Sequence, residues 1–309
     1  MKQVRFAGST APAVIAGMMR IEDRSDAQIR ALYDAARDSG VDFFDHADIY
    51  GRAMHGCEAR FADALALSPA ERDEITLQTK CGIVPDQGMF DFSYDHILRE
   101  VEGSLAALRT DRIDVLLLHR PDALVEPEEV ARAFDELHAS GKVRAFGVSN
   151  HTPRQIDLLR TAVTQPLVAN QLQLSIVHAP VIAQPLAANM AALEQSVGRD
   201  GGGIVEYCRI EGITVQAWSP YQSGLFTGVF LDDPAYPELN EALARIAEAH
   251  AVTPTAIATA WITRHPAGMQ VVLGTTTPSR VREAARGSDV ALSRAEWYEL
   301  FRAAGHTLP

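Results

Sequence analysis

The feature that most restricts the fold of this chain is a regular alternation of short apolar segments with helical segments. Residues 113–118, for example, form an apolar run, which is typical of a strand covered on both faces of a parallel sheet. Eight such strands are predicted, at residues 14–17, 41–44, 75–80, 113–118, 143–148, 167–169, 213–218 and 271–273. Apolar residues at a spacing of three or four predict the helices, at residues 27–38, 58–67, 94–108, 126–140, 153–161, 204–210, 239–250, 255–264 and 278–286.

Eight strand–helix units are the number that closes a (β/α)8 barrel, and this TIM barrel is the predicted fold. A doubly wound open sheet is the alternative, but no Gly-x-Gly-x-x-Gly follows a strand. Residues 1–13 are expected to be a lead-in with a small hairpin, and residues 293–304 an extra C-terminal helix. Ser68-Pro69 is expected to close the helix before it, and residues 175–203, with Gly201 to Gly203, to be irregular. The whole chain, 1–309, is expected to be one domain.

Four polar side chains stand at or just after the ends of three successive predicted strands. They are Asp45, Tyr50, Lys80 and His119. In a parallel α/β protein, such positions face the active site. A tyrosine that donates a proton needs a depressed pKa, which a nearby cation such as Lys80 provides. The four residues together therefore predict a catalytic site.

Composition excludes several classes of partner. The formal net charge is −12, which argues against nucleic acid and anionic membranes as main partners, although local donors can still bind an anionic cofactor. Cys57, Cys81 and Cys208 are an odd number at wide spacings, which indicates neither a disulfide framework nor a zinc site. There is no clear signal peptide and no long apolar stretch. We expect a cytoplasmic protein, monomeric or a small homo-oligomer, that acts on a small molecule.

Several motifs accompany these residues. They are His-Ala-Asp-Ile-Tyr-Gly, Lys-Cys-Gly, Leu-Leu-Leu-His-Arg-Pro-Asp, Gly-Val-Ser-Asn and Ala-Trp-Ser-Pro. With them, the chain resembles the aldo-keto reductase superfamily, and in particular its bacterial YdhF-like branch. The resemblance extends from Gly17 to the last helix. It implies a barrel that binds NADPH across its carboxyl face and reduces an aldehyde or ketone to an alcohol, reversibly.

The resemblance also implies a role for each catalytic residue. Tyr50 would protonate the carbonyl oxygen, Lys80 would lower the Tyr50 pKa, and Asp45 would hold Lys80. His119 would donate a hydrogen bond to the substrate carbonyl. Donors already in place stabilise the developing alkoxide charge.

The cofactor contacts that the resemblance implies are distributed along the second half of the chain. Ser149, Asn150 and Gln171 would hold the nicotinamide carboxamide, and Trp218 would stack on the ring. The remaining cofactor residues would be Gly17, the pyrophosphate loop with Ser219, Gly224 and Leu225, and the adenosine-phosphate segment with Gly274, Thr275, Thr276 and Arg280. Many related reductases carry a lysine where this chain has Gly274. Since Arg280 is a good phosphate ligand, NADP(H) is favoured, with NAD(H) or dual use as the alternative.

Loop residues predict the substrate pocket. They are Met19, Met54, Phe90, Arg120 and Tyr221, and their mixed apolar character suggests a medium-sized carbonyl compound. Arg120 either favours a carboxylated or otherwise anionic substrate or pairs with Asp122.

Two other interpretations compete with the reductase. Asp45, His46, Asp48 and His119 resemble ligands of a barrel hydrolase metal site, but Lys80 and Ser149-Asn150 are poor substitutes for the further ligands such a site needs, so no metal is expected. His46 is expected to pack away from the site. The second alternative is a non-catalytic subunit that senses the nicotinamide redox state on the same fold. The intact set of four residues favours the enzyme.

Overall fold

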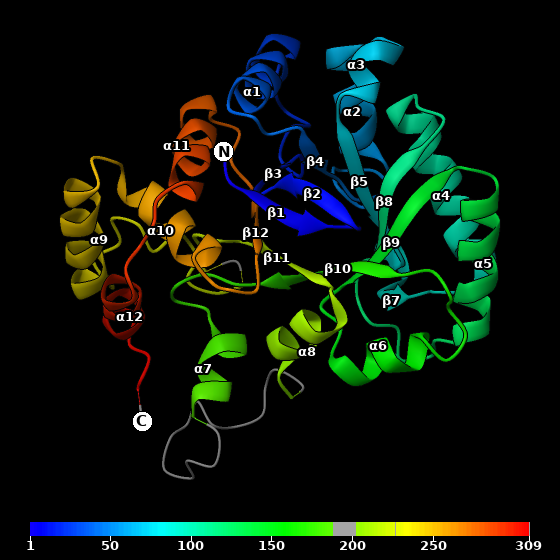
Figure 1. Cartoon of the computed structure of the whole chain (residues 1–309). Helices are drawn as coiled ribbons and strands as arrows, with labels where there is room; N and C mark the ends of the chain where they lie inside the picture. Colours follow the sequence, from blue (N-terminus) through cyan, green and yellow to red (C-terminus); the bar gives the residue numbers. More distant parts are fainter. Residues whose placement is uncertain (188–201, 226, 309) are drawn as a thin grey trace.

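The computed structural model describes residues 1–187, 202–225 and 227–308 (Figure 1). Within these residues, eight parallel strands form a closed barrel. They are β3 (Val14–Gly17), β4 (Phe43–Asp45), β5 (Thr76–Cys81), β8 (Ile113–Leu118), β9 (Val143–Ser149), β10 (Leu167–Gln173), β11 (Thr214–Trp218) and β12 (Gln270–Leu273). They follow one another around the barrel in chain order, and β12 pairs with β3 to close it. The predicted (β/α)8 barrel is confirmed.

Helices surround the barrel (Figure 1). They are α1 (Asp26–Asp38), α2 (Gly56–Leu65), α3 (Pro69–Asp73), α4 (Tyr94–Leu108), α5 (Pro127–Ala139), α6 (Pro153–Leu159), α7 (Pro180–Leu186), α8 (Ile204–Glu211), α9 (Pro237–Ala249), α10 (Pro254–Thr263), α11 (Pro278–Ser288) and α12 (Arg294–Ala303). Many begin with proline, whose missing N–H costs nothing in the first helical turn. The hydroxyl of Ser25 caps α1 and that of Ser293 caps α12, each in a capping box with the residue three positions later. The extra C-terminal helix is thus present as α12.

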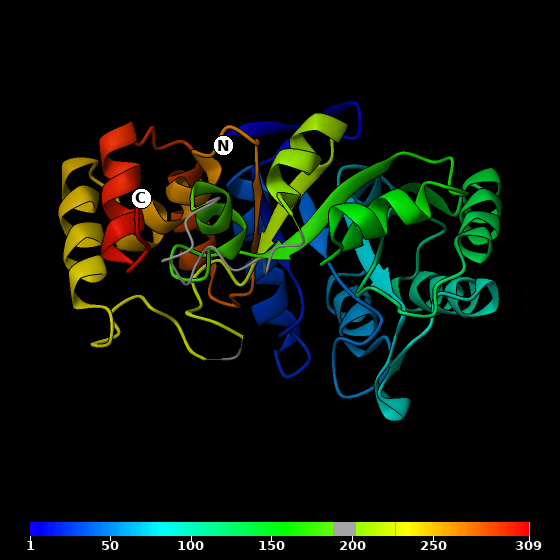
Figure 2. The ribbon, with the colours of Figure 1, turned by 90° about the horizontal axis from the view of Figure 1, so that it is seen from below.

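The amino-terminal end of the barrel is closed by a hairpin of β1 (Gln3–Phe6) and β2 (Ser9–Pro12). Phe6 packs edge-on against Phe43, with 5.3 Å between ring centroids, and both belong to a buried cluster with the inward side chains of several strands. The Thr214 hydroxyl donates to the Arg5 carbonyl at 2.9 Å and fixes the hairpin to β11. Figure 2 shows this hairpin and the β6–β7 region at opposite ends of the barrel. The expected lead-in hairpin is confirmed.

Glutamines occupy the middle of the barrel, where apolar side chains are the common filling. Gln78, Gln216 and Gln270, from β5, β11 and β12, are buried and bonded to one another at 2.9 to 3.1 Å. Gln270 donates to the Pro12 carbonyl of the hairpin at 2.8 Å, while Gln78 donates to the carboxylate of Asp45 at 2.6 Å. These hydrogen bonds therefore link the hairpin at the amino-terminal end of the barrel to Asp45.

Two local predictions need correction, and the loop after β5 contains further elements. Ser68-Pro69 does not simply end a helix, because Ser68 starts the short helix α3 with a capping box to Glu71 and proline in the first turn. The loop after β5 contains β6 (Ile83–Val84), the 3-10 turn η1 (Pro85–Gln87) and β7 (Met89–Phe90). The stretch expected to be irregular contains α7, whereas residues 188–201, including Gly201, lie outside the described residues. None of the described helices is both long and apolar enough to cross a membrane.

Candidate active site

The structure brings Asp45, Lys80 and Tyr50 into direct contact. Asp45 ends β4, Lys80 lies near the end of β5, and Tyr50 lies on the loop after β4. The Lys80 ammonium donates to Asp45 Oδ2 at 2.7 Å, to the His46 carbonyl at 2.7 Å and to the Tyr50 hydroxyl at 3.2 Å. An ammonium has three protons to donate, and these three acceptors use all of them.

Asp45 and Lys80 are fully buried, so each charge depends on the other. The second oxygen of Asp45 accepts from Gln78 at 2.6 Å and from Gln171 at 3.0 Å. Burial alone would lower the pKa of Lys80, but Asp45 and Tyr50 outweigh it and raise that pKa above its usual value. Lys80 therefore stays an ammonium at neutral pH.

The pKa of Tyr50 reflects opposing influences. Burial raises it, the charge of Lys80 lowers it, and Asp45 raises it again, with a net upward direction. Lys80 lowers the pKa of Tyr50, as predicted, but burial and Asp45 outweigh it. The predicted depression of the Tyr50 pKa is therefore not found. The phenol is therefore protonated at neutral pH, as a proton donor must be before it reacts.

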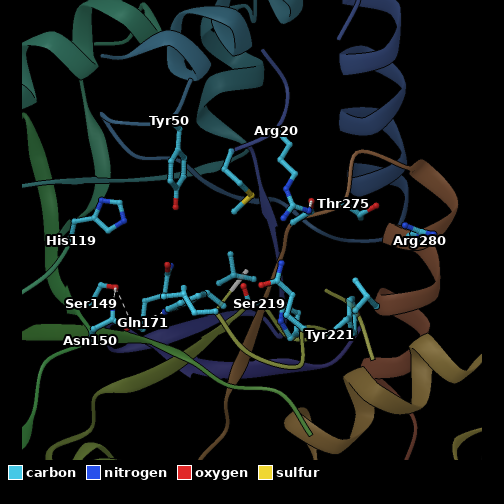
Figure 3. A pocket seen from close by; sticks show the side chains of 18 of the residues that line it. Arg20, Tyr50, His119, Ser149, Asn150, Gln171, Ser219, Tyr221, Thr275 and Arg280 are labelled. Carbon is cyan, nitrogen blue, oxygen red and sulfur yellow. Dashed lines mark hydrogen bonds between the residues drawn. The ribbon is translucent and has the colours of Figure 1, made fainter. Parts of the chain in front are cut away.

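His119 follows β8 and faces Tyr50 across the cavity, with 5.9 Å between the ring centroids (Figure 3). Its Nδ1 is buried and has no hydrogen-bond partner among the described residues. Burial, together with the charges of Lys80 and Arg120, holds the pKa of His119 well below its usual value. The imidazole is therefore neutral at physiological pH and has one N–H to donate.

A cavity of about 540 Å³ opens beside these residues. Fourteen of the predicted site residues line it, namely Met19, Tyr50, His119, Arg120, Ser149, Asn150, Gln171, Trp218, Ser219, Tyr221, Leu225, Gly274, Thr275 and Arg280. Figure 3 shows Tyr50 and His119 toward one end and Thr275 and Arg280 toward the other, with Arg20 between them. The cavity thus joins strand ends that are distant in sequence.

Polar groups near His119 are held in place by one another. Asn150 Nδ2 donates to Ser149 Oγ at 2.7 Å, and Ser149 Oγ donates to the Gln171 carbonyl at 2.9 Å. Trp218 Nε1 donates to Asn150 Oδ1 at 3.2 Å, so the indole and the amide share one orientation. Asn150 adopts a left-handed backbone (φ 61°), a conformation that asparagine tolerates better than most residues. These hydrogen bonds therefore fix the side chains of this part of the cavity wall before a ligand binds.

The other end of the cavity contains Gly274, Thr275 and Arg280, just before and within the start of α11. Arg20, which we did not predict, also lines it and donates through Nη1 to the Gly274 carbonyl at 3.0 Å. Among the described residues, neither Arg20 nor Arg280 forms an ion pair. Arg20 could have been found from sequence, because it follows the first barrel strand closely and so lies at the carboxyl end of the sheet.

Besides Asp45 and Lys80, which are fully buried, five predicted site residues do not line the cavity. They are Gly17, Met54, Phe90, Gly224 and Thr276. Gly17 meets a packing requirement, because a Cβ there would lie 2.3 Å from the Leu273 carbonyl of the neighbouring strand. Met54 and Phe90 are 40% and 43% exposed, on loops outside the cavity wall.

His46 does not join the catalytic side chains. Its ring packs edge-on against Phe61 at 4.8 Å, and neither ring nitrogen has a hydrogen-bond partner among the described residues. Burial lowers its pKa to about 4, so it is neutral. What His46 contributes to the site is its backbone carbonyl, which accepts from Lys80.

Behind the Tyr50 loop lies a buried acidic cluster. His55 bonds Glu58 through Nδ1 at 2.7 Å, and its Nε2 lies 3.3 Å from Glu100. These carboxylates outweigh the effect of burial and raise the pKa of His55 to about 9. Burial, with Glu58 and Glu100 nearby, raises the pKa of Asp48 to about 8. At neutral pH this cluster thus contains a protonated histidine and a protonated aspartic acid.

A parallel eight-stranded barrel with a buried Asp–Lys pair against a tyrosine, beside an elongated cavity, is what the resemblance to the aldo-keto reductases leads us to expect. Comparisons with known proteins agree. The model of the Aldo/keto reductase family matches residues 13–303, and the chain belongs to that family of enzymes.

Several proteins named as reductases or oxidoreductases are similar to this chain. A 6-dehydroglucose reductase of Agrobacterium fabrum is 37% identical over 93% of this chain and 92% of its own. Oxidoreductase YdhF of Escherichia coli is 34% identical over 96% of this chain and 94% of its own. The crystal structure of an aldo-keto reductase from Klebsiella pneumoniae in complex with NADPH matches with a TM-score of 0.76, covering 97% of this chain and 94% of that one at 24% identity.

Proposed function

We propose that this enzyme reduces an aldehyde or ketone to an alcohol with NADPH, and that Tyr50 is the general acid. The observation that carries the proposal is the Lys80 ammonium, buried between the Asp45 carboxylate and the hydroxyl of Tyr50, which itself lines the cavity. Such a contact stabilises a phenolate more than a phenol, so it favours loss of the Tyr50 proton. A non-catalytic sensor would not require this arrangement.

When bound, a reduced nicotinamide supplies the hydride that the carbonyl carbon receives. Tyr50 gives its hydroxyl proton to the carbonyl oxygen, so that a C–H and an O–H bond form as the carbonyl π bond breaks. Lys80 holds the resulting phenolate until water returns a proton to it. His119, being neutral, donates one N–H to the same carbonyl oxygen and fixes its position, which lowers the barrier through orientation.

The cavity fits a dinucleotide. Asn150 presents an amide group for a carboxamide, and Gln171, whose Nε2 donates to Asp45 and Gln216, has only its Oε1 to offer. Trp218 presents an indole face. At the other end, the guanidinium groups of Arg20 and Arg280 and the Thr275 hydroxyl suit phosphate oxygens.

We further propose that Arg20 takes the place of the lysine that many related reductases carry at position 274. A Cβ built on Gly274 would lie 3.6 Å from Arg20 Nη1, so the Arg20 charge occupies space that a longer residue 274 would enter. Two arginines then replace one arginine and one lysine, which supports a preference for NADP(H) over NAD(H). Arg20 lies on the loop after β3, far from Gly274 in the sequence, so the residues around Gly274 do not reveal this charge.

Titration of the purified enzyme with NADPH and NADH, followed by quenching of tryptophan fluorescence, tests the cofactor part. Consumption of NADPH with a panel of aldehydes and ketones tests the reaction. We expect binding of NADPH at least about tenfold tighter than NADH, which is about 1.4 kcal/mol. Absence of binding of both nucleotides would refute the proposal.

We also infer a cytoplasmic location. The three cysteines are buried and unpaired thiols, as in a reducing compartment. Cell fractionation with an antibody against the chain tests this inference, and recovery outside the cytoplasmic fraction would contradict it.

A further inference from the structure

Arg120 presents an unneutralised positive charge to the catalytic end of the cavity. It follows His119 directly after β8 and lines the cavity wall. Asp122, the partner that sequence suggested, is engaged elsewhere, because its oxygens accept from the backbone N–H of Phe92 at 3.0 Å and of Leu124 at 2.8 Å. Among the described residues, no carboxylate forms an ion pair with Arg120.

Trp218 holds the Arg120 guanidinium in place. The Arg120 Cζ lies 5.5 Å from the centroid of the Trp218 ring, a cation–π distance. Trp218 is itself fixed by its bond to Asn150. A guanidinium on an aromatic ring keeps its N–H groups free in its own plane, where they match the two oxygens of a carboxylate.

The surroundings of Arg120 disfavour its positive charge. Burial lowers the pKa of Arg120, and the nearby Tyr50 hydroxyl acts in the opposite direction. Lys80, the other cation at this end, is already matched by Asp45. The cavity wall also includes the uncharged Ile49 and Ile83, and the one carboxylate in it, Asp232, forms no ion pair among the described residues. A half-buried cation without a counter-ion gains most from an anion that enters the cavity.

We propose that the substrate is a carbonyl compound that also carries a carboxylate, and that Arg120 binds this carboxylate while Tyr50 and His119 bind the carbonyl oxygen. This inference rests on the proposed reductase function. Because Arg120 and His119 are consecutive residues, the carboxylate and the carbonyl should be separated by only a few bonds. Arg120 is thus a residue that determines substrate specificity.

The test compares 4-oxobutanoate with its methyl ester, a pair that differs in charge but not in the reacting aldehyde. The wild type should show a kcat/KM at least about tenfold higher for the acid, as expected for a charge-assisted bidentate contact. Arg120→Gln should lose this preference, because its kcat/KM should fall at least about tenfold for the acid and by less for the ester, while its affinity for NADPH should match that of the wild type. Arg154→Gln, which removes an exposed arginine 90% accessible on α6, is the matched control and should behave as the wild type.

Binding supplies a second measurement that does not need turnover. Titration of the enzyme with bound NADP+ by 4-oxobutanoate, a pair that cannot exchange a hydride, should give a Kd at least about tenfold lower for the wild type than for Arg120→Gln. Equal affinity, or equal kcat/KM for acid and ester in the wild type, would overturn the inference while leaving the reductase intact. Weaker NADPH binding by Arg120→Gln would also overturn it, by assigning Arg120 to the cofactor. Failure of every carbonyl substrate, with nucleotide binding absent, would instead refute the reductase.

Discussion

The guanidinium of Arg20 donates a hydrogen bond to the carbonyl of Gly274, at 3.0 Å, across 254 positions of the sequence. Closure of the barrel produces this contact, since β3 and β12 are the first and last barrel strands and pair with each other. A cation from the loop after the first barrel strand thereby reaches the segment before α11 that we propose binds the adenosine phosphate.

Arg20→Gln should weaken NADPH binding by about tenfold and change NADH binding by less than about twofold, because only NADPH has the additional phosphate. Fluorescence titration of both nucleotides measures this. Arg154→Gln serves as the control for a general loss of positive charge. Equal weakening of both nucleotides would place Arg20 at the pyrophosphate instead.

Tyr50→Phe should lower kcat by about 10²- to 10⁴-fold, the usual contribution of a general acid. The NADPH affinity should stay the same, because the hydroxyl is not part of the proposed nucleotide contacts. Stopped-flow and steady-state assays with one good aldehyde measure the loss. A variant with near-normal kcat would remove Tyr50 from its proposed role.

Lys80→Met should destabilise the protein by about 3 to 5 kcal/mol, because it leaves the buried Asp45 carboxylate without its counter-ion. The double variant Asp45→Asn with Lys80→Met should unfold at higher urea concentration than Lys80→Met alone, since both charges are then gone. Urea unfolding of the three proteins checks this relation. If the single variant is as stable as the wild type, Asp45 does not depend on Lys80.

The stability that Asp48 and His55 contribute should fall as the pH rises from about 4 to about 9. The pKa of Asp48 is about 8 in the folded protein against an ordinary 3.8, so the folded state holds a proton that the unfolded state has lost between these values. The pKa of His55 is about 9 against 6.5, so its contribution is complete below pH 6.5 and is lost as the pH rises through 9.

Asp48→Asn should remove the loss of stability that Asp48 causes between about pH 4 and 8. It should retain the loss above pH 6.5 that His55 causes. Thermal unfolding at pH 5, 7 and 9 measures both, with differences of a few degrees, since ~1 kcal/mol shifts the Tm of a chain this size by roughly 2 to 4 °C. An unchanged profile would show that Asp48 keeps an ordinary pKa.

The sequence alone was sufficient for the barrel and, through its resemblance to a known family, for most of the cavity wall. Strand and helix periods are local properties, and the carboxyl ends of parallel strands must meet at one edge, so Asp45, Lys80 and His119 could be placed together without coordinates. The N-terminal hairpin and the helix α12 were also predictable, because turn and capping signals are local.

Side-chain directions and contacts across the barrel were decided only by the tertiary structure. They depend on register and packing between distant strands, which local patterns do not encode. Thus Arg20 lines the end of the cavity proposed for the cofactor phosphate, whereas Met54 and Phe90 do not line the cavity. Asp122 accepts from two backbone amides, which leaves Arg120 without a carboxylate partner among the described residues. The Tyr50 pKa likewise follows from burial, which sequence does not measure.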